Sequence, residues 1–387
     1  MESRGIFTDL LREFKKNDHC VYVVCANERK LKRNTELTEE SGINMLRVKT
    51  GNVTQVNMIE KGISTLLVKH QFKRAIQKYF KSVKFDLVLY STPPITLADV
   101  VQYVKKRDGA KTYLMLKDIF PQNAVDIEIM KEKGFIYKHF RKVEKNLYKV
   151  SDYIGCMSPG NRVYLLHHNP EIPSDIVEIC PNSISPISIE KNEHEIIEVR
   201  KKYNIPLDKT IFIYGGNLGK PQGIDYLIEC LRANTTNDNI FFLIAGSGTE
   251  FNKLKNYFDR EKPGNATLLH KLTKLDYEIL ANSCDVGLIF LDNRFTIPNF
   301  PSRILSYMQA SVPVLATTDA NTDLGQIIKD GNFGLWCESN DVNEFNKKVK
   351  QLCNSELRKQ MGVNARQYLE NYYTSRHSYE IIMKHFE

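Results

Sequence analysis

Residues 211–223 read Ile-Phe-Ile-Tyr-Gly-Gly-Asn-Leu-Gly-Lys-Pro-Gln-Gly, an apolar run that ends in a glycine-rich turn before a helix-like stretch. Gly215, Gly216 and Gly219 allow backbone N–H groups to approach an anion, and Lys220 adds a positive charge. The spacing is neither a Walker A loop nor G-x-G-x-x-G. The segment predicts a strand, a phosphate-binding turn and a helix, and the alternative is a tight turn that binds no ligand.

Outward from this segment, strand-like and helix-like stretches alternate along all 387 residues, a pattern typical of α/β proteins with mostly parallel sheets. Predicted strands cover residues 19–25, 85–90, 112–117, 153–157, 211–214, 240–245, 286–290 and 312–316. Predicted helices cover residues 7–16, 95–107, 136–150, 223–232, 275–281, 302–310 and 343–353. At about 150 residues per domain, this length predicts two to three domains.

Proline density marks the predicted domain boundary, with Pro170, Pro173, Pro181 and Pro186 before a charged helical stretch that ends near Pro206. We expect a first doubly wound, Rossmann-like domain over residues 1–186, a linker over 187–209 and a second such domain over 210–367. Residues 368–387 are expected to pack back on the first domain. In open parallel sheets, ligands bind at the carboxyl ends of the strands, so we expect a cleft where the two domains face each other.

The first domain departs from the usual order, because a helix-like stretch follows Gly5 almost at once. A doubly wound domain normally opens with a strand, so the first strand is predicted to be absent. We considered a start codon set too far downstream, a truncated chain and a sheet that tolerates the loss. We favour the first explanation.

Two further segments of the second domain are candidates for anion binding. In residues 295–310, Pro301 suits a first helical turn, so the N–H groups of Ser302, Arg303 and Ile304 are predicted to point out of the helix start. The alternative is an ordinary capped helix with a solvated arginine. Residues 245–250, Ala-Gly-Ser-Gly-Thr-Glu, place Gly246 and Gly248 at a strand end, as a ligand-binding loop or as a simple turn.

In the first domain, Asp118 follows a predicted strand and is the carboxylate best placed for chemistry, with a helix-cap or turn role as the alternative. No Asp-x-Asp triplet occurs in the sequence. We therefore predict no metal site. Eight cysteines lie scattered without a Cys-x-x-Cys pair, which favours free thiols in a reducing compartment.

The net charge of +8 lies entirely in the first 190 residues, which hold 30 basic and 22 acidic residues against 24 and 24 in the remainder. Such asymmetry indicates nucleic acid, an anionic membrane or an acidic ligand, or merely a lysine-rich surface. Residues 68–83 and 136–150 read as basic amphipathic helices whose apolar stripes pack on the sheet or enter lipid. No apolar run reaches the roughly 18 residues of a membrane span, and no signal peptide is visible.

The order of these motifs resembles family 4 of the retaining glycosyltransferases of GT-B fold, in the branches that build bacterial capsule, O-antigen or exopolysaccharide. Residues 181–183 read Pro-Asn-Ser, and residues 215–223, 246–250, 301–308 and 313–316 follow in the family's order. Residues 113–122, Tyr-Leu-Met-Leu-Lys-Asp-Ile-Phe-Pro-Gln, are similar to its Arg-Asp-x-Trp-Pro-Glu stretch. The resemblance covers essentially the whole chain except the missing strand.

The resemblance implies a nucleotide-sugar donor in the second domain and an acceptor in the first. By position, donor-binding residues are expected to be Gly5, Gly215, Gly216, Asn217, Gly219, Gln222, Gly246, Gly248, Ser302, Ile304 and Ser306. The family's frequent basic pair reads Asn217 and Gln222 here. The two glutamates of its Glu-x7-Glu motif align with Pro298 and Ser306.

The expected function is retaining, metal-independent transfer of a hexosyl group to a lipid-linked saccharide in surface polysaccharide biosynthesis. Lys220 and Arg303 are expected to stabilise the leaving diphosphate, and Asp118 to contact the acceptor or sugar hydroxyls. No cofactor is expected, and no nucleic acid. We expect a cytoplasmic protein, peripheral on the inner face of the plasma membrane. The alternatives are a nucleotide-sugar epimerase or phosphorylase on the same fold, or a basic nucleic-acid-binding protein.

Overall fold

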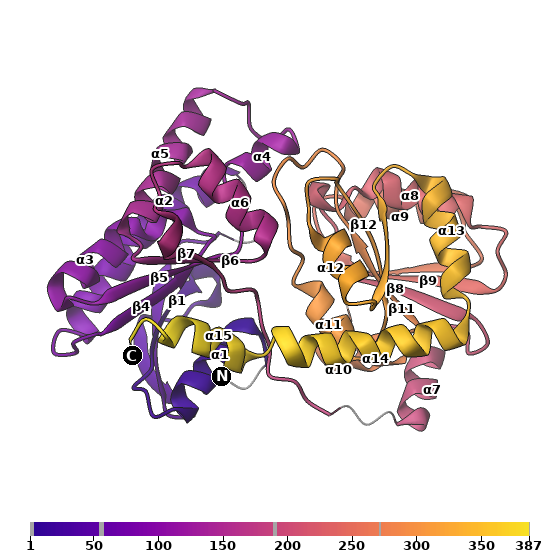
Figure 1. The fold of residues 1–387 in the computed structure, drawn as a ribbon, viewed down its shortest axis with the longest axis horizontal. Helices are drawn as coiled ribbons and strands as arrows, with labels where there is room; N and C mark the ends of the chain where they lie inside the picture. Colours follow the sequence, from indigo (N-terminus) through magenta and orange to yellow (C-terminus); the bar gives the residue numbers. More distant parts are fainter. Residues whose placement is uncertain (1–3, 54–57, 189–191, 271, 387) are drawn as a thin grey trace. The chain divides into compact units, whose positions relative to one another are not determined.

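The computed structural model describes residues 4–53, 58–188, 192–270 and 272–386. The chain forms two compact units, and each is described by itself (Figure 1). Unit 1 comprises residues 1–185 and 375–387, and unit 2 comprises residues 186–374. The expected linker, residues 187–209, falls within unit 2, and its residues 189–191 lie outside the described residues.

Unit 2 contains one continuous parallel sheet of six strands in the order β10-β9-β8-β11-β12-β13. The strands are β8 (Thr210–Asn217), β9 (Ile240–Ser247), β10 (Ala266–Leu269), β11 (Val286–Phe290), β12 (Val314–Thr318) and β13 (Gly334–Glu338). The helices are α7 (Glu193–Lys202), α8 (Ile224–Ala233), α9 (Phe251–Glu261), α10 (Lys274–Ser283), α11 (Arg303–Gln309), α12 (Leu324–Asp330), α13 (Val342–Leu352) and α14 (Ser355–Tyr372). Every residue of β11 and β12 is buried, as a parallel sheet with helices on both faces requires.

Unit 1 contains two smaller sheets. One has the order β1-β3-β2, with β1 (Tyr22–Glu28) parallel and β2 (Glu36–Glu40) antiparallel to β3 (Ile43–Thr50). The other is parallel, in the order β4 (Leu87–Ser91), β5 (Lys111–Leu116), β6 (Tyr153–Cys156) and β7 (Val177–Ile179). The helices are α1 (Ile6–Lys16), α2 (Met58–Tyr79), α3 (Ala98–Asp108), α4 (Gln122–Asp126), α5 (Phe135–Val150), α6 (Pro159–His168) and α15 (Ser375–Met383).

The two sheets of unit 1 share both of their helical layers. Leu87 and Leu89 of β4 and Cys25 of β1 pack in one cluster with α1 and α15. On the opposite face, Val24 of β1 and Val88 of β4 pack with α2 and α3. Among the described residues, β1 pairs only with β3 and β4 pairs only with β5, so each of them has one unpaired edge. No described strand precedes α1. The two sheets are therefore one layer interrupted between β1 and β4.

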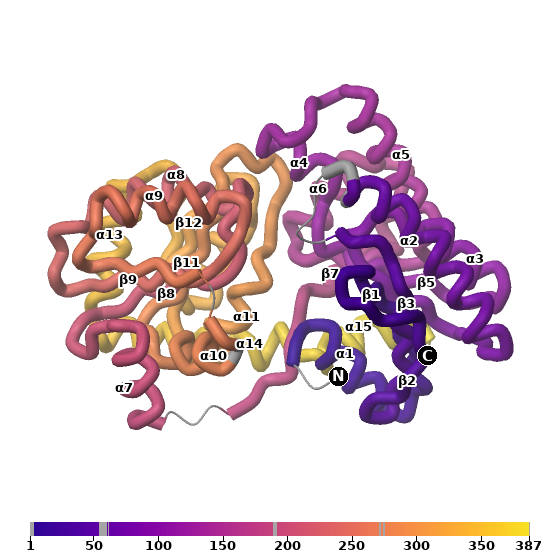
Figure 2. The backbone as a smooth tube through the Cα atoms, turned by 180° about the vertical axis from the view of Figure 1, so that it is seen from behind, coloured from indigo at the N-terminus to yellow at the C-terminus, as the bar shows by residue number. Residues whose placement is uncertain are grey.

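The chain returns to unit 1 at its carboxyl end, where α15 packs against α1 (Figures 1 and 2). Ile382, which is fully buried, joins Leu10 and Phe14 in the cluster. The hydroxyl groups of Ser378 and Ser183 lie 2.7 Å apart in a buried hydrogen bond. These contacts fix α15 to the first part of the chain.

Several predicted elements differ from the structure. The predicted strands do not include the hairpin β2–β3 or the strands β7, β10 and β13, because their apolar positions are few or interrupted by polar and charged residues. The amphipathic stretch predicted at residues 68–83 belongs to the longer helix α2, which ends at Tyr79. Ile136, predicted to join a packed or membrane-inserted stripe, lies in the first turn of α5 and is 60% exposed.

Candidate functional site in unit 2 and the first-domain edge

The side chain of Arg303 lies against the carboxyl end of β8. The guanidinium of Arg303 stacks over the ring of Tyr214, 4.2 Å from its centroid. A Cβ atom added to Gly216 would lie 2.5 Å from Nη2 of Arg303, and Gly216 has a φ of 132°. Glycine is therefore required here both by the backbone conformation and by the close approach of the arginine.

Arg303 is surrounded by tyrosines rather than by acids. The side chains of Tyr214, Tyr277 and Tyr307 lie around it, and a Cβ atom at Gly215 would lie 2.3 Å from the Tyr277 hydroxyl. Among the residues that the structure describes, no carboxylate forms an ion pair with Arg303. Arg303 is partly buried, and an arginine stays charged in proteins, so it has given up part of its hydration without gaining a counter-ion among these residues. The site is therefore suited to an anion.

The turn after β8 is tied together by one side chain, Gln222. Its Oε1 accepts from Nδ2 of Asn217 at 2.8 Å and from the N–H of Gly219 at 3.1 Å. Lys220 is exposed and begins the short 3-10 helix η4 (Lys220–Gln222). The two positions that the resemblance aligns with a basic pair, Asn217 and Gln222, therefore hydrogen-bond to each other.

Gly246 and Gly248 have a structural reason to be glycine. A Cβ atom at Gly246 would lie 1.9 Å from the carbonyl oxygen of Gly216, and one at Gly248 would lie 2.2 Å from that of Leu218. The end of β9 thus packs backbone against backbone on the turn after β8. This packing leaves no room for side chains at the two glycines.

The start of α11 differs from the prediction. The helix begins at Arg303 with Ser302 as N-cap, two residues after Pro301. The N–H of Ile304 donates to the carbonyl of Pro301 at 3.2 Å, so the prediction of a free amide at Ile304 is wrong. The chain already turns tightly there, because Ser302 has helical angles. Ser306 lies exposed one turn further along.

In unit 1, Asp118 lies just beyond the carboxyl end of β5. Its Oδ1 accepts from Nδ2 of Asn123 at 2.8 Å. Burial raises the pKa of Asp118 to about 6, against the lowering effect of the Asn123 and Ile119 hydrogen bonds. Thr92 fixes the backbone, because its Oγ1 accepts from the N–H of Asp118 and donates to its carbonyl at 3.1 and 3.0 Å.

Lys117, which the sequence reading did not single out, is partly buried beside Asp118. Its Nζ contacts Oδ1 of Asn182 and lies 4.5 Å from the centroid of the Phe7 ring. Burial lowers its pKa to about 8. The available signal in the sequence was a lysine that directly follows the buried run 112–116 of β5.

Gly5 lies at the N-cap of α1, where its carbonyl accepts from the N–H of Asp9 at 2.9 Å and from Oγ1 of Thr8 at 3.0 Å. Its φ of 168° is extended backbone that any residue adopts. The structure therefore gives no backbone reason for glycine at this position.

Within the described ranges, no group of three His, Cys, Asp or Glu side chains is arranged to hold a metal ion. The same residues include no helix with the length and apolar character needed to cross a membrane.

Comparison with known protein families identifies a match within unit 2. Residues 195–368 match the family model Glycosyl transferases group 1. The chain is also 23% identical, over 79% of its length and 77% of the relative's, to the probable glycosyltransferase WbjE of Pseudomonas aeruginosa. The matched residues span nearly all of unit 2, including β8, α11 and the turn between β8 and α8.

Solved structures extend the likeness to both units. The glycosyltransferase WaaG, involved in lipopolysaccharide biosynthesis, superposes with a TM-score of 0.60 at 15% identity, over 97% of this chain and 95% of WaaG. Anabaena Alr3699/HepE in complex with UDP-glucose gives a TM-score of 0.62 at 12% identity, over 89% and 86%. The two parallel α/β units therefore form a GT-B fold, as the sequence predicts.

Proposed function

We propose that the protein is a retaining, metal-independent glycosyltransferase of family 4 that transfers a hexosyl group from a nucleotide sugar. The observation that carries the proposal is Arg303, a guanidinium held by tyrosines at the carboxyl edge of a parallel sheet, with no carboxylate partner among the described residues. A diphosphate supplies the missing negative charge. The similarity to HepE, which is described in complex with UDP-glucose, supports a nucleotide sugar as the ligand.

In the proposed reaction, the bond between the sugar and the diphosphate breaks as the acceptor hydroxyl bonds to the same carbon on the same face. Negative charge grows on the leaving diphosphate, which takes up the acceptor's proton. Arg303 stabilises that charge from a fixed position, and the exposed Lys220 adds a second positive charge. Asp118 in unit 1 orients hydroxyl groups, as a carboxyl whose pKa burial raises to about 6.

The proposed acceptor is a lipid-linked saccharide of a surface polysaccharide such as capsule or O-antigen. The similarity to WaaG, described as involved in lipopolysaccharide biosynthesis, supports a surface polysaccharide. We place the protein at the cytoplasmic face of the plasma membrane. The first turn of α5 supports this location, because Phe135 is 89% exposed and Ile136 60% exposed next to the exposed Lys133 and Lys138. Such a mixture of apolar and basic side chains suits an anionic lipid surface.

Calorimetric titration with UDP, GDP, TDP and their glucose or mannose derivatives tests the donor site. We expect one nucleotide class to bind the wild type, and Arg303→Met to weaken that binding about 10- to 100-fold, the cost of losing a charge-assisted contact. Arg232→Met is the matched control, because Arg232 is exposed in unit 2 and pairs with Glu261. Absence of binding, or equal effects of the two variants, would contradict the proposal.

Product analysis without an acceptor separates transfer from epimerase or phosphorylase activity, since only those two yield a new sugar nucleotide or a sugar phosphate.

Sedimentation with anionic vesicles tests the membrane location. We expect Phe135→Ser to release the protein from vesicles, while Leu275→Ser, an equally drastic change at an exposed leucine of unit 2, leaves it bound. Failure of wild-type protein to bind these vesicles would exclude the proposed location.

A further inference from the structure

The interruption in the sheet layer of unit 1 lies between two strands that each have one unpaired edge. Among the described residues, β1 hydrogen-bonds to β3 and β4 to β5, and neither pairs with the other. The backbone N–H and C=O groups of a strand point alternately toward its two edges, so both strands turn donors and acceptors toward the interruption. Such edges pair readily with another extended segment.

The side chains along both edges are apolar but only partly buried. They are Tyr22, Val23, Val24 and Cys25 in β1, and Leu87, Val88 and Leu89 in β4. Ala26 of β1 is exposed, whereas Val48, its partner in β3, is only 2% exposed. Residues of β3 and β5 share the helical layers that cover β1 and β4. The exposure therefore results from the absence of a lateral neighbour and not from a missing helix.

The two edges alternate between the helical layers in the same way. Val23 and Leu89 lie in the cluster formed with α1 and α15. Val24 and Val88 lie in the cluster formed with α2 and α3, on the opposite face. A strand between β1 and β4 is therefore covered on both faces. A segment that is apolar at successive positions fits such a place, as in the buried strands of other parallel sheets.

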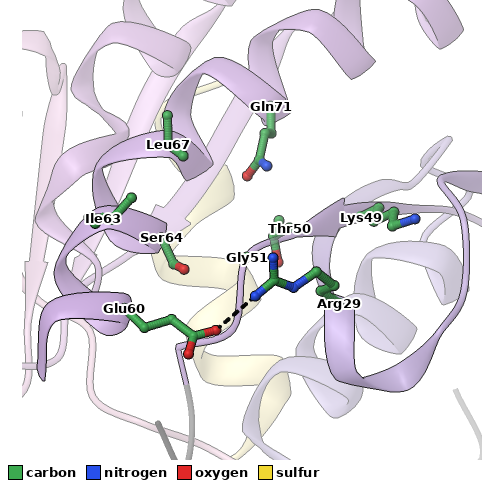
Figure 3. Close-up of a pocket in the computed structure, with 9 residues that line it drawn as sticks. All are labelled: Arg29, Lys49, Thr50, Gly51, Glu60, Ile63, Ser64, Leu67 and Gln71. Atoms are coloured by element: carbon green, nitrogen blue, oxygen red, sulfur yellow. Dashed lines mark hydrogen bonds and ion pairs between the residues drawn. The ribbon is translucent and has the colours of Figure 1, made fainter. Parts of the chain in front are cut away.

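The carboxyl end of β1 is held from the side away from the interruption. Arg29 donates from Nη2 to Oε1 of Glu60 in α2 at 3.1 Å, beside the pocket shown in Figure 3. The N–H of Lys30 donates to Oδ1 of Asn52 at 2.8 Å, and Nδ2 of Asn52 donates to the same oxygen of Glu60 at 2.9 Å. These contacts join β1 to the loop after β3 and to α2. The edge of β1 is thus preformed for a further strand.

The start of α1 shows at which end such a strand leaves the sheet. Nζ of Lys117, which directly follows β5, lies 4.5 Å from the centroid of the Phe7 ring, so α1 begins at the carboxyl edge of the sheet. Leu10 of α1 then packs in one cluster with residues of β1 and β4, and the chain continues into β1. This arrangement is the second half of a β-α-β unit. Its first strand runs parallel to β1 and ends just before α1.

We propose that the interruption binds one extended apolar segment of five residues, the length of β4, which runs parallel to β1 and β4 and is joined to this chain ahead of α1. Residues 1–5 read Met-Glu-Ser-Arg-Gly, which suits a turn between a strand and a helix better than a strand buried on both faces. The strand-forming residues therefore lie ahead of them. The inference concerns unit 1 alone and does not depend on the proposed function.

Hydrogen exchange of the 387-residue chain tests the unpaired edges. We expect the amides of β1 and β4 that point into the interruption to exchange at least about tenfold faster than the amides of β3 and β5, because their opening requires no neighbouring strand to separate. Equal protection of the four strands would overturn the proposal, since it would mean that β1 and β4 already have partners.

The occupant is tested by comparing the 387-residue chain with two forms that carry Val-Ile-Val-Ile-Val or Gly-Ser-Gly-Ser-Gly directly ahead of Met1. Alkylation by iodoacetamide reports on Cys25, which is partly buried in β1, with the exposed Cys20 as internal control. We expect the apolar segment alone to slow alkylation of Cys25 at least about tenfold, by covering the edge of β1. Cys20 should react equally in all three forms. Equal rates at Cys25 would overturn the proposal.

A fourth form, with Val-Ile-Asp-Ile-Val ahead of Met1, is the matched control for specific insertion. A carboxylate between two apolar helical layers is costly, so we expect this form to alkylate at Cys25 like the 387-residue chain. If it protects Cys25 as well as the apolar segment does, insertion is not the cause and the proposal fails. Protection that rises with protein concentration would assign the place to a second copy and would equally overturn the proposal, as would slower exchange at the outer edge of β2 instead of at β1 and β4.

Discussion

The parallel sheets of the two units differ in continuity. In unit 2, β8 is flanked by β9 and β11, and the core residues of β11 and β12 are fully covered. In unit 1, β1 and β4 each lack a neighbour on one side among the described residues. Most of their residues are only partly buried, although helices cover both faces. Helical layers alone therefore do not bury a parallel strand that has lost its lateral neighbour.

The edges of the two sheets also differ in charge. Unit 2 holds Arg303 beside tyrosines, so its edge is cationic. In unit 1, burial moves Asp118 and Lys117 toward their neutral forms, with pKa values of about 6 and about 8. The basic excess lies in the first 190 residues, whereas the proposed diphosphate site lies in unit 2, most of which belongs to residues 191–387, where basic and acidic residues are equal in number.

The largest expected contrast is in core truncation. Leu288→Ala in β11, where the side chain is fully buried, should cost about 3–4 kcal/mol of unfolding free energy, as expected for a cavity in a rigid core. Leu89→Ala in β4 should cost about 1–2 kcal/mol, since Leu89 is only partly buried beside the interruption. Urea unfolding, followed separately in each unit by hydrogen exchange, measures both. Equal losses would show that the interruption does not loosen unit 1.

A smaller effect is expected from Asp118→Asn. The native pKa of Asp118, about 6, lies above its ordinary value, so its stabilising contribution is complete below about pH 4 and is lost as the pH rises through 6. Between pH 4.5 and pH 7, the free energy of unfolding of the variant should rise by about 1–2 kcal/mol relative to that of the wild type. Thermal unfolding at both pH values checks this. If the unfolding temperature of the variant fell relative to that of the wild type as the pH rises, the result would contradict the desolvation of Asp118.

The smallest effect is expected for Lys117→Met. The native pKa of Lys117, about 8, lies below its ordinary value, so the charged form costs stability at neutral pH. We expect the variant to be about 1 kcal/mol more stable at pH 7 and to lose this advantage as the pH rises toward 10. Denaturation at pH 7 and pH 9.5 measures the difference. A less stable variant at pH 7 would mean that Lys117 is compensated by its contact with Asn182.

The sequence could predict unit 2 well, because the apolar run before Gly215 identifies β8 and the glycines identify its turn. It could not predict that Arg303 has no acidic partner among the described residues, since the surrounding tyrosines come from β8, α10 and α11. Local patterns predict strands and turns, whereas the missing partner of a buried group depends on tertiary packing.

The central claim is that a nucleotide sugar binds at the edge of unit 2 beside Arg303. Hydrogen exchange of the wild-type protein with and without UDP-glucose, the ligand described for HepE, tests it most directly. We predict slower exchange confined to residues 214–223 and 300–306, and no such change in Arg303→Met. Slower exchange in unit 1 alone, or the same protection in wild type and variant, would contradict the account.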